Sequence, residues 1–233
     1  MQFVEKNSFN VRSTVYLMRN ADSATEFLLF SMVHIGSLDF YERVTERLTK
    51  CDLILMEGVD SKRVNALTLS YRFIRFIKRM DLVTQNEALD IRQFKAKMRS
   101  ADIKGEHFDK SWRSQSLWFR LLIFLTVPVW VVYLALFGTR RIIAKHLAVE
   151  DLESSDEILL RDEDTERLDD ILLKDRDQII IGQISNLIEE DGDEKRRVAV
   201  VFGAFHMRNI VKYLYEKRGY RITNSEWLTV FDL

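Results

Sequence analysis

Four side chains of this 233-residue sequence have types and spacings that could do chemistry: His34, Glu57, Arg176 and His206. Each histidine ends a matched motif, SMVH and GAFH, directly after an apolar run, and Glu57 ends a third apolar run, LILME. Two imidazoles and a carboxylate can hold a borderline divalent cation, or they can act as a metal-free acid–base pair. The residue types leave both kinds of site open.

The elements that must position these side chains form an α/β (α+β) pattern. Strands are predicted over residues 14–18, 26–33, 52–56 and 197–202, and amphipathic helices over 39–50 and 209–218. Parallel strands joined through helices end at the same edge of a sheet. We therefore expect a mostly parallel central sheet, built from two related strand–GxxH–helix halves, with His34 beside Glu57.

The chain is predicted to form a single domain over residues 1–233. Residues 62–148 are expected to be a large helical insertion with an apolar segment at 117–138, and 149–165 an acidic linker. A helix over 168–190 carries Arg176, and a last strand is expected over 227–231. The single cysteine, Cys51, lies in an apolar run, so a buried reduced thiol is expected.

The uncharged stretch of residues 121–138 has the minimum length of a membrane-spanning helix. A single crossing would place Glu57 and His206 on opposite sides of a bilayer, so a single span is disfavoured. We expect a peripheral or re-entrant helix pair around Pro128 on a membrane surface or on a second copy of the chain, with basic neighbours contributing. Because the first apolar run is short and interrupted, the expected location is cytoplasmic and membrane-associated.

The motifs resemble those of the TraB/PrgY/GumN and Tiki superfamily, which is related to the ChaN and erythromycin esterase folds. The resemblance rests on the paired GxxH-like turns, on Glu57 in LMEG, on Arg176 between two aspartates and on GAFHMRNIVKYL, and it covers residues 12–231. One departure is Ser31, which stands where the family usually has glycine.

The resemblance implies a metal-dependent hydrolase that cleaves peptide bonds and associates with membranes, as in pheromone shutdown. His34, Glu57 and His206 would hold a divalent metal such as Mn²⁺ or Co²⁺, and Arg176 would bind a carboxylate or stabilise developing negative charge. All four residues would then be catalytic.

Two rival functions remain open at this point. One is a non-catalytic membrane-associated regulator that sequesters a peptide, and the other is metal-free esterase-type hydrolysis with His34 or His206 as the base. A peptide or protein is the expected substrate or partner. No nucleic acid is expected, because basic and aromatic residues do not interleave as in a nucleic-acid module.

Overall fold

A computed structural model describes residues 1–58, 80–102, 117–145, 147, 149–150, 173–190, 192 and 194–233. The strands are β1 Gln2–Lys6, β2 Asn10–Arg19, β3 Thr25–Met32, β4 Ile35–Gly36, β5 Leu53–Met56, β6 Val83–Thr84, β7 Met98–Ser100, β8 Val149–Glu150, β9 Arg196–Gly203 and β10 Arg221–Asp232. The helices are α1 Leu38–Thr49, α3 Gln85–Ala88, the 3-10 helix η2 Ile91–Lys97, α5 Leu117–Phe137, α6 Arg140–Lys145, α9 Asp175–Glu189 and α10 Ala204–Arg218.

The main sheet has the strand order β7-β5-β9-β3-β2-β1-β8, and β10 pairs with β2. The strands β7, β5, β9 and β3 are parallel, which confirms the predicted α/β fold with a parallel centre. Every residue of β5 is buried, as expected for a strand that is covered on both faces. Beyond β3 the sheet continues through antiparallel pairs, which differ from the expected parallel pattern.

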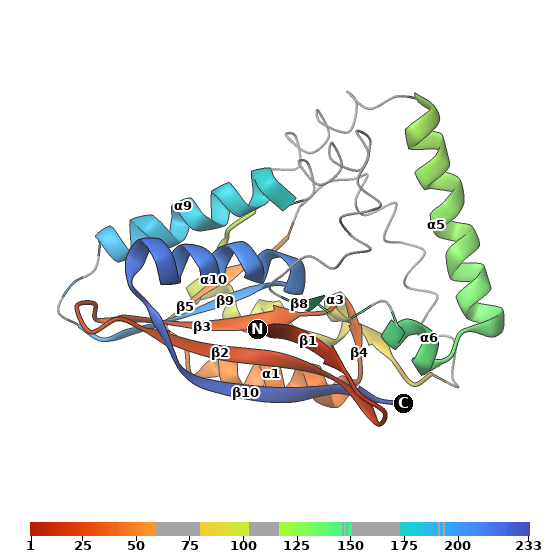
Figure 1. Cartoon of the computed structure of the whole chain (residues 1–233), viewed down its shortest axis with the longest axis horizontal. Helices are drawn as coiled ribbons and strands as arrows, with labels where there is room; N and C mark the ends of the chain where they lie inside the picture. The colour runs from red at the N-terminus through yellow and green to blue at the C-terminus, as the bar shows by residue number, and fades with distance from the viewer. Residues whose placement is uncertain are drawn as a thin grey trace.

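Helices cover both faces of this sheet (Figure 1). The pair α9 and α10 lies on one face and α1 on the other. The predicted helix over 39–50 is confirmed as α1, which begins after Ser37, whose side chain accepts a hydrogen bond from the Phe40 N–H. The carboxyl ends of β5 and β9 lie next to each other and next to the amino ends of α9 and α10.

The second GxxH-like motif differs from expectation in where its helix begins. α10 starts at Ala204, directly after β9, so His206 lies in its first turn; a start at residue 209 had been expected. After β3, by contrast, the chain forms the short strand β4 before α1 begins. The two turns are therefore not equivalent in structure, although their spacing in the sequence matches.

The predicted insertion is only partly described. Residues 59–79, 103–116 and 151–172 lie outside the described residues, and with them most of the expected linker at 149–165. The expectation of helices up to residue 100 is met by α3 and η2 and is wrong at β6 and β7, of which β7 adds a parallel strand to the main sheet beside β5. Val149 and Glu150, expected in the linker, pair with β1 as β8.

The apolar segment forms one continuous helix, α5, with Pro128 inside it. The expected helix pair around Pro128 is therefore wrong: the missing N–H of a proline weakens a helix but does not have to end it. Among the helices that the structure describes, none has the length and apolarity of a segment that crosses a membrane.

Candidate functional site

A buried group of charged side chains lies where the parallel strands end. Glu57 directly follows β5, and Asp102 comes two residues after β7. Arg176 and Asp177 lie in the first turn of α9, and His206 lies in the first turn of α10. The carboxyl ends of parallel strands are where open α/β sheets place their ligands.

Arg176 joins the two strand-end carboxylates. Its Nε and one terminal nitrogen donate to Asp102 at 2.8 and 2.7 Å, and the same terminal nitrogen also donates to Glu57 Oε1. The Asp102 side chain has no exposed area, and its Oδ2 also accepts the Gly58 N–H at 3.0 Å. The two-point contact fixes the plane of the guanidinium group, so Arg176 has a defined orientation toward Glu57.

His206 is held from its other side by Asp177. The Nδ1 atom of His206 lies 2.6 Å from Asp177 Oδ1, and Asn209 donates to Asp177 Oδ2 at 2.5 Å. When Asp177 accepts the Nδ1 proton of the neutral ring, Nε2 carries the lone pair. That Nε2 atom lies 3.8 Å from Glu57 Oε1, beyond hydrogen-bond distance, so the basic nitrogen and the carboxylate border the same space.

The surroundings of Glu57 keep it ionised. Burial would raise the pKa of Glu57, but the positive charge of Arg176, the charges that His206 and His34 carry when protonated, and the Gly203 N–H lower it below its ordinary value. The Gly203 N–H donates to Glu57 Oε2 at 2.5 Å. A Cβ atom at position 203 would lie 3.2 Å from that oxygen, so glycine gives the carboxylate its close approach to the backbone.

The structure brings Glu57, Arg176 and His206 together but leaves His34 at the rim. The His34 side chain is exposed, although it is near enough to Glu57 to lower the pKa of that carboxyl. Among the described residues, no group of three or more His, Cys, Asp or Glu side chains is arranged to hold a metal ion. Metal binding by His34, Glu57 and His206 therefore stays a prediction.

The departure at Ser31 has a simple structural explanation. Ser31 is buried, and its hydroxyl lies 3.1 Å from the Thr14 hydroxyl. Gly219 and Asp81 are the residues with a positive φ in the described part of the chain, so the backbone at Ser31 does not require glycine.

Three members of the polar group were not predicted as site residues: Asp102, Asp177 and Asn209. Asp102 follows a strand as Glu57 does, but the three-residue β7 was too short to be recognised as a strand. Asn209 stands three residues after His206, so both side chains lie on one face of α10. That i, i+3 spacing was the signal in the sequence that could have identified a shared partner.

Comparison of the chain with protein-family profiles, with curated proteins and with solved structures gives no match in any of the three.

Proposed function

We propose that the chain is a hydrolase, peptidase-like in its substrate, whose active site is the group formed by Glu57, Arg176 and His206. The observation that carries the proposal is the buried arrangement in which His206 Nε2 faces Glu57 Oε1 at 3.8 Å. An imidazole fixed by one carboxylate and facing a second is suited to activating water and moving a proton. A peptide as substrate rests on the resemblance of the motifs to the TraB and Tiki group.

Arg176 has a distinct role in this proposal. Its guanidinium is oriented by Asp102 and contacts Glu57, at the edge of the sheet where a substrate would arrive. There it would bind a substrate carboxylate or stabilise the negative charge that develops on the attacked carbonyl.

A divalent metal such as Mn²⁺ or Co²⁺ forms part of the proposal because the chemistry of the donor groups suits one. The buried carboxylates of Asp102 and Asp177 and the largely buried carboxylate of Glu57 share this site with the guanidinium of Arg176. The Nδ1–carboxylate contact of His206 is the usual outer support of a metal-binding histidine. His206 Nε2 and Glu57 would hold the ion with His34 from the rim, and the ion would lower the pKa of a bound water.

A metal-free hydrolase is the second candidate, and one observation favours it. The Asp177–His206 contact at 2.6 Å is also the arrangement of a carboxylate that orients a general base. In this route His206 Nε2 takes a proton from water, and Glu57 stabilises the imidazolium that forms.

The test is hydrolysis of a peptide library and of simple esters by the whole chain, after chelation and again after return of Mn²⁺ or Co²⁺. The metal-dependent route predicts loss of activity on chelation and recovery with metal, and the metal-free route predicts no change. Glu57→Gln should abolish turnover, whereas Glu226→Gln, the same substitution in the exposed Arg47–Glu226 pair, should leave it unchanged. Stoichiometric capture of a peptide without any product would refute the hydrolase proposal and favour the sequestering regulator.

A further inference from the structure

The helix α5 carries a long apolar face that the described protein leaves exposed. The exposed fractions of its outward side chains reach 73% at Trp118, 59% at Leu125 and 67% at Val129. At 3.6 residues per turn, the exposed side chains spread over more than half of the circumference, and Leu134, which is 3% exposed, lies on the opposite side. An apolar surface of this extent marks an interaction site.

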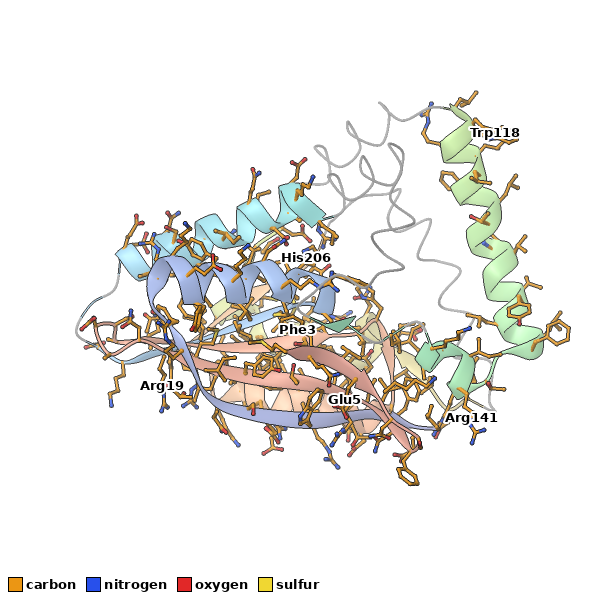
Figure 2. The ribbon with its side chains drawn as sticks, viewed as in Figure 1. Phe3, Glu5, Arg19, Trp118, Arg141 and His206 are labelled. Atoms are coloured by element: carbon orange, nitrogen blue, oxygen red, sulfur yellow. The ribbon has the colours of Figure 1, made fainter. Side chains whose placement is uncertain are left out.

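The helix also stands apart from the sheet (Figure 2). Trp118 lies at the end of α5 that is farthest from the strands, and the other end leads into α6, where Arg141 lies. The 21 residues of α5 give a rod about 30 Å long. The exposed face can therefore lie along a flat surface over its length.

The charged residues within this segment are of one sign, and Asp81, outside it, pairs with Arg140. Residues 117–145 contain no acidic residue and four basic ones, Arg120, Arg140, Arg141 and Lys145. Arg140 donates hydrogen bonds to the carbonyl oxygens of Met80 and Asp232, so it holds the base of α5 to the body of the protein. Arg141 and Lys145 are exposed beside it.

We propose that α5 and the exposed cations of α6 bind an anionic lipid surface, with α5 lying at the interface. The apolar face enters the boundary of the acyl chains, and Arg141 and Lys145 contact the headgroups. The charge argues against a second copy of the chain as the occupant, because two basic α5–α6 segments would repel each other when paired. Lipid headgroups supply the complementary charge.

The polar contacts on either side of α5 restrict its orientation in such a complex. Asp102, before the helix, is bound by Arg176, and Arg140, after it, is bound to Met80 and Asp232. A single crossing by α5 would separate these two anchored positions. The helix therefore lies on the surface, with the sheet and its polar site on the aqueous side.

Flotation of the full chain with vesicles tests this proposal without reference to activity. Vesicles of phosphatidylcholine and phosphatidylglycerol at a ratio of roughly 3:1 should bind at least about tenfold more protein than pure phosphatidylcholine, and added salt should weaken the binding. Arg141→Glu with Lys145→Glu should reduce binding about tenfold or more, because each cation adds independently to the attraction. Lys195→Glu with Lys212→Glu, the same charge change at exposed positions of other segments, is the matched control and should bind as the unchanged protein does.

A second pair of variants tests whether the apolar face of α5 contributes to vesicle binding. Leu125→Glu with Val129→Glu should remove binding, whereas Phe9→Glu, at a side chain that is 78% exposed outside α5, should not. If the α5 variant fails to fold, as judged by circular dichroism, the α6 charge variant decides the question. Equal binding to neutral and anionic vesicles, or retained binding by both double variants, would overturn the proposal. A change of α5 that converts a dimer to a monomer in light scattering, without affecting vesicle binding, would assign the face to a second copy instead.

Discussion

Individual side chains at the proposed site depend on the partners that fix them. His206 can present Nε2 to Glu57 because Asp177 holds Nδ1, and Arg176 can face Glu57 because Asp102 holds the guanidinium in two places. Asp102 and Asp177 are therefore positioning residues, which act through the groups that they orient.

Replacing Asp177 with asparagine tests this positioning. Asp177→Asn should lower kcat about 10- to 100-fold with a smaller change in KM, because the ring loses its fixed orientation and favoured tautomer. The kcat pH profile should shift as well, which a loss of stability alone would not produce. Asp39→Asn, in an exposed pair with Arg43, is the control, and an unchanged kcat in Asp177→Asn would contradict the role.

Cys51 gives a second prediction at this scale. The thiol is 3% exposed, and burial raises the pKa of Cys51 to about 11. At pH 8 only about 0.1% of it is thiolate, the form that reacts. Iodoacetamide should therefore label the folded protein far more slowly than the urea-unfolded protein, as followed by mass spectrometry, and equal rates would show that the thiol is accessible.

At the scale of elements, the end of β9 controls how closely Glu57 approaches the backbone. Gly203→Ala would place a Cβ 3.2 Å from Glu57 Oε2, closer than ordinary van der Waals contact. The substitution should lower turnover more than it lowers the free energy of unfolding, because the displaced group is the carboxylate of the site. Measuring kcat beside urea unfolding separates the two effects, and a fully active Gly203→Ala protein would contradict this geometry.

Two glycines, Gly219 at the end of α10 and Gly182 inside α9, allow the effect of a glycine-to-alanine substitution to be compared at two backbone conformations. Gly219 has a φ of 70°, so Gly219→Ala should destabilise the protein by about 1 kcal/mol. Gly182 lies inside α9, where an added Cβ meets nothing within 4 Å, so Gly182→Ala should stabilise by about 0.5–1 kcal/mol. Urea unfolding of both variants checks the opposite signs, and a shared sign would show that packing outweighs backbone conformation.

The periodicity of the sequence located α1, β5 and β9 but found only part of the longest strands: β10 begins at Arg221 and β2 at Asn10, six and four residues before their expected starts. α1, β5 and β9 lie within one residue of their expected bounds at every end, because an apolar run or stripe marks them. β4, β6 and β7 have two or three residues each, too few for a period to show. α10 begins before its apolar stripe, so its first turn and the place of His206 within it could not be read from the pattern.

At the scale of the whole molecule, the site joins distant parts of the chain. Glu57 and Asp102 come from before α5, and Arg176 and His206 come from after it. The rule that parallel strands share an edge led to the expectation of His34 beside Glu57, whereas the side chain that faces Glu57 is His206, which the matched motifs and the family resemblance had grouped with it. The rule could not predict that Asp102 binds Arg176 or that Asp177 binds His206. Those contacts depend on how α9 and β7 pack against the sheet, and no local sequence pattern records that packing.

Acid should lower the free energy of unfolding through protonation of Glu57. The pKa of Glu57 lies below its ordinary value of 4.5 in the folded protein, so the unfolded chain binds the proton first as pH falls. The stability that ionised Glu57 contributes is complete above about pH 4.5 and is lost as pH falls through the lowered value. Between pH 5 and 3, the free energy of unfolding should decline less steeply in Glu57→Gln than in Glu226→Gln, and identical slopes would contradict a lowered pKa of Glu57 in the folded protein.

The proposed chemistry is tested most directly by the fate of water oxygen. The whole chain, supplied with Mn²⁺ or Co²⁺, is incubated with a peptide library in water enriched in ¹⁸O, and the products are read by mass spectrometry. We predict cleaved peptides whose new carboxyl group carries ¹⁸O, and no such products from His206→Ala or Glu57→Gln. Intact peptides throughout, or labelled products that persist in both variants, would contradict a hydrolytic site at Glu57 and His206.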